Sequence, residues 1–376
     1  MKNGGENGRA DLDGAEDIRG NQTARQKKSN KKALFLKTFS ISILVFAFIA
    51  TAGLYLAMRM AKPPEIPAPD LSDIAYYPLK AHEDDRNIGN GVIVPENFTV
   101  SDRKEAFYTF VVFGIDVGAN TDTLIVASYD GKNDEAHMVH IPRDSLVNVS
   151  RSIKKINAAY GAGTLNGGGR EGGVSQLKRE LKTIIGFAPD FYISVNMNAF
   201  IRVVDAVGGV EVTVPFHMLY DDPDQDLHIN LPAGTRTLTG REALHFARYR
   251  TGNDPNRTIS DYRRIEHQQQ VIKEVISRLL RPANLLKIPE FIEIFNTNVF
   301  HNLKAEDILW FANEFKGISG LDILQTHVLP TLDSVRYNVV YEILDEEGVL
   351  ELVNATINPY IKDIEAKDLD IITKFN

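Results

Sequence analysis

A run of 21 residues without a charged side chain, Thr38 to Met58, constrains this chain more than any other segment. It is long enough to cross the hydrocarbon core of a bilayer as a helix. Six basic residues lie between positions 25 and 37, whereas only Arg59 and Lys62 follow the run closely. The positive-inside rule therefore predicts a single-pass type II protein of the cell membrane, with a cytoplasmic N-terminus. The alternative, a cleaved signal peptide, would have a shorter apolar stretch and a small-residue cleavage site.

Composition divides the chain into four predicted parts. Residues 1–32 are polar without an apolar period and should form a disordered cytoplasmic tail. Residues 33–60 form the transmembrane anchor, and the proline-rich residues 61–105 form an extended extracytoplasmic linker. Residues 106–376 form the folded domain.

Charge and cysteine content exclude several kinds of function. The first 60 residues hold ten basic and five acidic residues, so the remainder has 32 basic and 45 acidic residues and a formal net charge of −13. An acidic body argues against general nucleic-acid binding. The chain has no cysteine, which excludes disulfides, thiolate metal sites and a cysteine nucleophile.

The folded part alternates strand-like and helix-like segments, a pattern that predicts a layered α/β domain whose sheet is covered by helices. Expected strands are 108–113, 123–129, 136–141, 191–195, 210–214 and 323–329. Expected helices are 155–160, 174–185, 200–207, one from Thr239, one from Ser260 or Asp261, 285–295, 306–315 and 347–357. Residues 161–173 are rich in glycine but lack a Walker motif, and we interpret them as a mobile loop.

Two carboxylates, Asp116 and Asp122, flank the turn between the first two expected strands. Either alone is typical of a turn-forming residue. Together, at the end of a buried strand, they indicate a site for a hard cation, because Mg²⁺ is held by one or two carboxylates plus phosphate oxygens and water.

The segment from Leu238 to Gln270 concentrates arginine in an otherwise acidic chain. Guanidinium groups match phosphate and carboxylate oxygens two at a time, so the cluster indicates an anion site, although a solvated charged face has the same pattern. The arginines are Arg248, Arg250, Arg257, Arg263 and Arg264.

A carboxylate, a guanidinium and an amide are spaced to share one helix face within this segment. Asp261, Arg264 and Gln268 follow one another at offsets of three and four residues. Arg143, directly after the third expected strand, stands where ligand-facing residues often lie. These residues are the strongest indication of a functional site.

Several motifs occur in an order that resembles the LytR-CpsA-Psr family of membrane-anchored cell-wall glycopolymer ligases. The resemblance covers roughly Phe107 to the C-terminus, and the anchor is also as that family would have it. The motifs are Gly114-Ile115-Asp116, Thr121-Asp122-Thr123, residues 140–145 (HIPRDS), 155–160 (KINAAY), 204–210 (VDAVGGV), 238–244 (LTGREAL), Arg248-Tyr249-Arg250, and 261–265 (DYRRI) leading to Gln268-Gln269.

The resemblance implies a central mixed β-sheet covered by helices on both faces, and transfer of a glycopolymer from a polyprenyl-pyrophosphate carrier to peptidoglycan, with pyrophosphatase as a side activity. The glycopolymer would be teichoic acid, capsular or another anionic wall polysaccharide of a Gram-positive-type bacterium. Asp116 and Asp122 would hold Mg²⁺, and Asp261 would be the general base beside Arg264 and Arg143. Further contacts to the substrate phosphates would come from Arg248, Arg250, Arg257, Gln268 and Lys155.

Three departures from the family pattern leave a second function open. This chain has Gly118, Asn120 and His267 at positions where the family usually has arginine. Fewer fixed positive charges favour a catalytically degenerate polyprenyl-phosphate binder or assembly scaffold, whereas the retained aspartates and arginines favour the enzyme. A transcriptional regulator, as the family's historical name suggests, is disfavoured by the acidic extracytoplasmic domain and the lack of a helix-turn-helix pattern.

Overall fold

The computed structural model describes residues 52–66, 102–115, 119–223, 227–254, 257–285, 287–315, 324–336 and 339–372. The chain divides into two compact units, 1–60 and 61–376. The described part of the first unit is a helix over residues 52–60. Most of the expected anchor and linker lies outside the described residues, and among the described helices none is long and apolar enough to cross a membrane.

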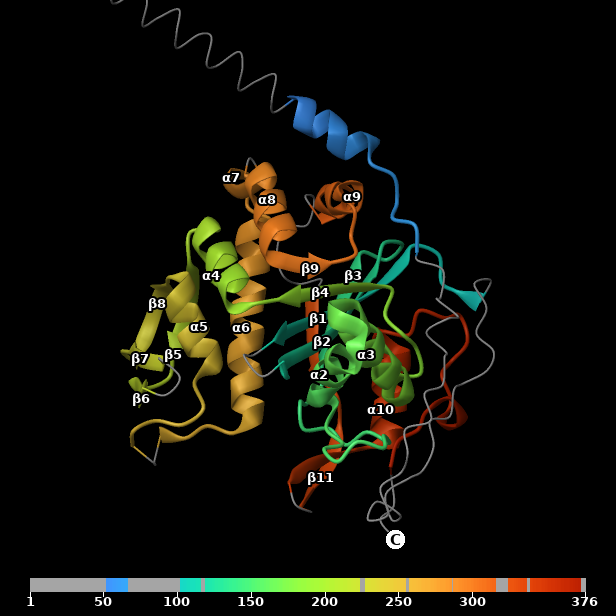
Figure 1. The fold of residues 1–376 in the computed structure, drawn as a ribbon. Helices are drawn as coiled ribbons and strands as arrows, with labels where there is room; N and C mark the ends of the chain where they lie inside the picture. The colour runs from blue at the N-terminus through green and yellow to red at the C-terminus, as the bar shows by residue number, and fades with distance from the viewer. Residues whose placement is uncertain are drawn as a thin grey trace, which may run out of the picture. The chain divides into compact units, whose positions relative to one another are not determined.

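A six-stranded sheet forms the centre of the second unit (Figure 1). Its strands are β1 (Phe107–Ile115), β2 (Thr121–Asp130), β3 (Glu135–His140), β4 (Phe191–Val195), β9 (Val299–His301) and β10 (Leu324–Val328). They lie in the order β10-β3-β2-β1-β4-β9. The β1–β4 and β3–β10 pairs are parallel and the others antiparallel, which confirms the expected mixed sheet.

Helices cover both faces of this sheet, as expected. Side chains on β1 alternate between the faces. Val111 and Phe113 belong to a core shared with α3 (Gly169–Ile185) and α10 (Glu346–Thr356). Tyr108 faces the other way and meets Trp310 of α9 (Ala305–Phe315) in an edge-to-face contact at 5.3 Å. Trp310 is buried in this packing, with 8% of its surface exposed.

A second, smaller core lies beside the sheet. It consists of α4 (Met197–Ala206), β5 (Val210–Val214), β6 (Met218–Asp222), β7 (Leu227–Leu231), β8 (Gly234–Leu238) and α5 (Gly240–Arg248). The sequence did not predict β6, β7 or β8. Each is only five residues long, and in β8 only Leu238 is buried. Strands β7 and β8 put polar side chains on their outer faces, so no continuous apolar run marks them.

Helix α5 belongs to this small core, and α6 (Asp261–Leu279) leads from it to the pocket described below. Thr239 and Glu242 form a capping box at the start of α5, where the sequence predicted a helix to begin. Ser260 caps α6 by accepting a hydrogen bond from the backbone of Arg263. The buried residues of this helix include the polar side chains of Arg264, His267 and Gln268 beside Ile265 and Val271.

The interpretation of residues 161–173 as a mobile loop is wrong. Helix α2 (Ala159–Gly163), a π-helical turn (Thr164–Gly168) and the first residues of α3 occupy this segment. A Cβ on Gly163 would lie 2.2 Å from the backbone oxygen of Gly172, and one on Gly173 would meet the ring of Tyr160. The glycines therefore permit α2 and α3 to pack closely, a role that composition alone does not distinguish from a loop.

A hairpin of β11 (Thr331–Arg336) and β12 (Val340–Leu344) completes the part of the fold that bears on the pocket. The sequence did not predict it. The backbone of Glu342 donates to Asp144 O and accepts from Leu146 N, both at 2.9 Å. These bonds join β12 to the segment that follows β3. Shorter helices α7 (Pro282–Leu285) and α8 (Ile288–Asn298) precede β9.

Candidate active site

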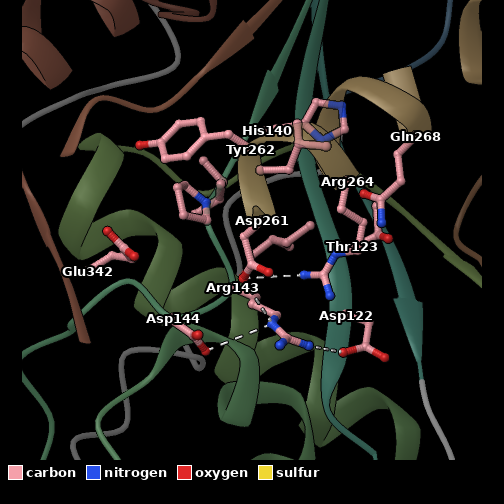
Figure 2. Close-up of a pocket in the computed structure, with 14 residues that line it drawn as sticks. Asp122, Thr123, His140, Arg143, Asp144, Asp261, Tyr262, Arg264, Gln268 and Glu342 are labelled. Carbon is pink, nitrogen blue, oxygen red and sulfur yellow. Dashed lines mark hydrogen bonds and ion pairs between the residues drawn. The ribbon is translucent and has the colours of Figure 1, made fainter. Parts of the chain in front are cut away.

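A pocket lies at the end of the sheet where β2 begins, β3 ends and α6 starts (Figure 2). Strand β2 runs antiparallel to β3, so the start of one and the end of the other come to the same edge. The N-terminus of α6 adds the positive end of a helix dipole. The lining residues are Asp122, Thr123, Leu124, His140, Ile141, Pro142, Arg143, Asp144, Asp261, Tyr262, Arg264, Ile265, Gln268 and Glu342.

The Asp261 carboxylate lies among three guanidinium groups. Its Oδ2 is 3.6 Å from Arg264 Nη2 and 3.8 Å from Arg143 Nε, and its Oδ1 is 3.3 Å from Arg250 Nε. Arg143 also donates to Asp122 Oδ1 at 2.9 Å. Asp144, whose Oδ1 is 3.9 Å from Arg143 Nε, and Glu342 also line the pocket. The three guanidinium groups that converge on Asp261 can pair with the oxygens of an anionic ligand.

Several polar atoms at this centre have no hydrogen-bond partner among the described residues. They are Nε of Arg143, Nε of Arg264 and Oδ1 of Asp261. Buried polar atoms are nearly always satisfied in folded proteins, and each unsatisfied donor or acceptor costs about 1–3 kcal/mol. The two guanidinium Nε atoms could donate to oxygens of a ligand, and Oδ1 of Asp261 could accept a hydrogen bond from a ligand hydroxyl.

Arg264 is the most deeply buried of these cations, with 8% of its surface exposed. Burial is the main cause that lowers its pKa, and the nearby Arg143 adds to the effect, while Asp261 and Asp122 oppose it. An arginine remains charged at any physiological pH. The lowered pKa means that burial and the nearby Arg143 make the charged form less favourable than it is in water. An anion bound between Arg264 and Arg143 would relieve that repulsion.

Of the two carboxylates predicted to hold Mg²⁺, the structure describes only Asp122, because Asp116 lies outside the described residues. The Asp122 side chain is 47% exposed. One carboxylate oxygen accepts from Arg143, and the other points away from it (Figure 2). The described part of the chain contains no group of three or more His, Asp or Glu side chains placed to hold a metal ion. One outward carboxylate oxygen fits a Mg²⁺ ion that takes its other ligands from phosphate and water.

The remaining predicted residues divide between the pocket and its surroundings. Gln268 lines the pocket and donates to Ala247 O at 3.4 Å, while Arg250 reaches the centre through Asp261. Lys155 bonds Asp144 at 2.9 Å and so acts on the pocket through a lining residue.

Two of the predicted arginines are engaged elsewhere. Arg248 lies 3.7 Å from the sulfur of Met197. Arg257 donates to His217 O at 2.8 Å and faces Asp254. Neither is among the residues that line the pocket.

Sequence reasoning missed five polar residues of the pocket wall, which are Thr123, His140, Asp144, Tyr262 and Glu342. Asp144 immediately follows Arg143 and Tyr262 immediately follows Asp261, so proximity to a predicted site residue was an available signal for both. Glu342 offered no such signal, because it reaches the pocket from the unpredicted hairpin.

His140, also in the lining, is 1% exposed, and burial lowers its pKa to about 4. Because the folded state disfavours the charged ring, stability is greatest above the unfolded pKa of about 6.5 and falls as pH drops toward 4. We expect the free energy of unfolding to fall by about 2 kcal/mol from pH 7 to pH 5 because of this residue. Urea unfolding of wild type and His140→Asn at both pH values measures it. Equal losses of stability in the two proteins would contradict the prediction.

One departure from the family pattern lies away from the pocket. His267 stacks on Phe246 of α5 with ring centroids 4.3 Å apart, and burial lowers its pKa. Uncharged at neutral pH, it belongs to the α5–α6 packing rather than to the pocket lining. Asn120 is half-buried in the turn before β2, and Gly118 lies outside the described residues.

The chain matches one family model, described as the LytR_cpsA_psr family, over residues 79–358. A curated protein of Bacillus subtilis, polyisoprenyl-teichoic acid–peptidoglycan teichoic acid transferase TagV, is 29% identical over 235 residues, covering 60% of this chain and 57% of TagV. The chain thus spans less than two thirds of that relative. TagU of Bacillus licheniformis, which has the same transferase name, is 25% identical over 348 residues, covering 89% of this chain and 97% of TagU.

A solved structure has the same fold. The crystal structure of B. subtilis TagV superposes with a TM-score of 0.55 at 26% identity, covering 67% of this chain and 96% of that chain.

Proposed function

This chain belongs to the LytR-CpsA-Psr family, and from that membership we propose that it transfers a glycopolymer from a polyprenyl-pyrophosphate carrier to peptidoglycan. The relatives named above are teichoic acid transferases, so a teichoic acid or a similar anionic wall polymer is the proposed cargo. The observation that carries the proposal is the position of Asp261 between Arg143 and Arg264, whose Nε atoms both lack a hydrogen-bond partner among the described residues.

The proposed reaction exchanges one phosphorus–oxygen bond for another. A hydroxyl oxygen of peptidoglycan attacks the phosphorus that carries the glycopolymer. The bond from that phosphorus to the bridging oxygen breaks, and polyprenyl monophosphate leaves with the bridging oxygen. The attacking hydroxyl loses its proton to a base, so the product is a phosphodiester between glycopolymer and peptidoglycan.

Asp261 is the proposed base, since its Oδ1 is an unsatisfied acceptor within the pocket. Arg143 and Arg264 would bind the non-bridging phosphate oxygens and the charge that develops on the leaving phosphate. Arg250 and Gln268 border this centre and would orient the same groups.

Asp122 would hold Mg²⁺, together with Asp116, which stands between β1 and β2 in the sequence. When bound there, the ion would neutralise pyrophosphate charge and polarise the leaving group. Asp122 would then also fix Arg143 through the 2.9 Å bond that joins them. This bond would direct Arg143 and the Asp122-bound ion toward the same pyrophosphate.

A reconstituted assay with a polyprenyl-pyrophosphate glycopolymer, peptidoglycan and Mg²⁺ tests the function. We expect wild type to form the phosphodiester and release polyprenyl monophosphate. Chelation should lower the rate by at least about a hundredfold, the scale for removing an electrostatic stabiliser, and added Mg²⁺ should restore it. Unimpaired transfer after chelation would contradict the metal assignment, whereas tight lipid binding without any transfer would favour the scaffold function.

A membrane location with the domain outside follows from the basic residues before Thr38 and is proposed with the substrate. Protease added to intact protoplasts should remove the domain beyond Lys62 and leave a short N-terminal fragment. A domain that stays protected until the membrane is permeabilised would contradict this topology, and with it access to peptidoglycan.

A further inference from the structure

Arg250 reaches the proposed active site from the loop between α5 and α6 rather than from a helix or a strand. It follows Tyr249, the residue at which α5 ends, and its Nε lies 3.3 Å from Asp261 Oδ1. The Arg250 side chain is 51% exposed, so packing restricts it only in part. A long side chain with several rotatable bonds keeps much of its freedom in such a place. The position of the guanidinium therefore depends strongly on the backbone of the loop.

Tyr249, directly before Arg250, is fixed in the small core. It is 0% exposed, and its ring packs edge-to-face on Phe216 with the centroids 5.8 Å apart. Its hydroxyl donates a hydrogen bond to Arg257 O at 2.7 Å, eight residues further along the chain. A buried hydroxyl without a partner would be costly, so this bond holds the two segments together.

Further hydrogen bonds close the same loop and tie it to the small core. The backbone of Ile259 donates to Arg250 O at 2.8 Å, so the two ends of the loop are joined. Arg257 Nη1 donates to His217 O at 2.8 Å, in the connection between β5 and β6. Loops whose ends meet in this way are compact and are often functional. Arg250 stands at the first position of this closed loop.

Gly252 leaves the space that the Tyr249 hydroxyl occupies. A Cβ on Gly252 would lie 2.4 Å from that hydroxyl, whereas the next nearest atom, Leu219 O, would be 3.3 Å away. Gly252 does not have a positive φ, so its backbone does not require glycine. The lack of a side chain at this position therefore serves the close approach of the hydroxyl.

We infer that Tyr249 is a positioning residue for Arg250. Its hydroxyl, seated against Gly252 and bonded to Arg257 O, fixes the loop that presents the Arg250 guanidinium to the substrate pyrophosphate. Tyr249 does not line the pocket, so it acts through its neighbour and not on the substrate. A guanidinium held in place before binding loses less entropy when the pyrophosphate arrives. This inference rests on the proposed function and assigns one of its binding residues a support in the small core.

A double-mutant cycle in the full-length protein tests the link between the two residues. Calorimetric titration with a water-soluble polyprenyl-pyrophosphate analogue measures binding without turnover. Arg250→Ala should weaken binding about tenfold or more. Tyr249→Phe removes only the hydroxyl, and it should weaken binding about three- to tenfold in wild type but less than about twofold in Arg250→Ala. Equal losses in the two backgrounds, or no loss in wild type, would overturn the inference.

Gly252→Ala tests the seat of the hydroxyl by a second route. Its Cβ displaces the hydroxyl, so it should weaken binding as Tyr249→Phe does, and the two substitutions together should be no worse than either alone. Tyr220→Phe is the matched control, because its hydroxyl bonds Asp222 on β6 at 3.1 Å, outside the loop. We expect it to bind as wild type does. Additive losses from Gly252→Ala and Tyr249→Phe, or an equal loss in Tyr220→Phe, would contradict the positioning role.

Hydrogen exchange separates this inference from the proposed function, because it needs no ligand. The Ile259 amide, which is bonded to Arg250 O, should exchange about tenfold faster in Tyr249→Phe than in wild type. The Val271 amide, in the buried part of α6, should exchange at the same rate in both proteins. If wild type transfers no polymer, the proposed function fails, yet this measurement still decides whether Tyr249 fixes the loop. Unchanged exchange at Ile259, or an equal increase at Val271, overturns the inference.

Discussion

Asp261→Asn should abolish glycopolymer transfer, with a loss of about a thousandfold or more, while the affinity for the polyprenyl-pyrophosphate donor stays within a few-fold. The amide has the size and shape of the carboxylate but cannot take a proton from the attacking hydroxyl at neutral pH. A base is needed only in the chemical step, so binding of the donor does not depend on it. Single-turnover transfer and equilibrium donor binding, measured on the same preparation, separate the two effects.

Asp254→Asn is a suitable control for this substitution. Asp254 is an exposed carboxylate that faces Arg257 at 3.6 Å and is not part of the pocket lining. We expect it to transfer at the wild-type rate. Transfer by Asp261→Asn within tenfold of wild type would show that another group accepts the proton.

Arg264→Ala should impair both binding and chemistry, which distinguishes it from Asp261→Asn. A charge-assisted contact to a phosphate contributes about 1.5–3 kcal/mol, so we expect donor binding about 10- to 150-fold weaker. A further loss of about a hundredfold should appear in the transfer step, because the guanidinium also faces the charge of the transition state. Donor titration followed by single-turnover kinetics at saturating donor measures the two parts separately.

Arg263→Ala provides the matched comparison, because Arg263 is the neighbouring arginine on the same helix, is 69% exposed and pairs with Glu266. It should behave as wild type in both assays. Arg264→Lys retains the charge but lacks the planar fork, so it should recover only part of the binding. If Arg263→Ala and Arg264→Ala weaken donor binding equally, the effect is one of overall charge, and Arg264 has no special place in the pocket.

Local regularities in the sequence predicted the parts of the site that a single element holds together. Asp261, Arg264 and Gln268 share a face because helical periodicity fixes their spacing whatever the rest of the chain does. The end of β3 likewise placed Arg143 correctly, since an apolar run marks a buried strand and its last residue. Most strands of the central sheet were recognised in the same way.

The rest of the site depends on long-range pairing, which no local pattern encodes. Glu342 enters the pocket because β12 bonds to the segment after β3, about 200 residues earlier in the sequence. Arg250 and Arg257 look alike in the sequence, yet the path of the loop between α5 and α6 turns one toward Asp261 and the other toward His217. Periodicity could not separate these two arginines.

The length of α6 has a mechanical consequence for the proposed active site. Its 19 residues make a rod about 28 Å long, with Asp261 and Arg264 at one tip. Toward the other end of the helix, Arg278 donates hydrogen bonds to Glu274 Oε1 at 2.6 Å and to Gly208 O at 3.3 Å. Gly208 lies between α4 and β5 of the small core. Tilting such a rod by about 5° about its far end would swing the near tip by about 2.5 Å, a displacement larger than catalysis tolerates. The small core therefore fixes the C-terminal end of α6. Substitutions in that core lie far from the substrate, yet they can move Asp261 and Arg264 out of alignment.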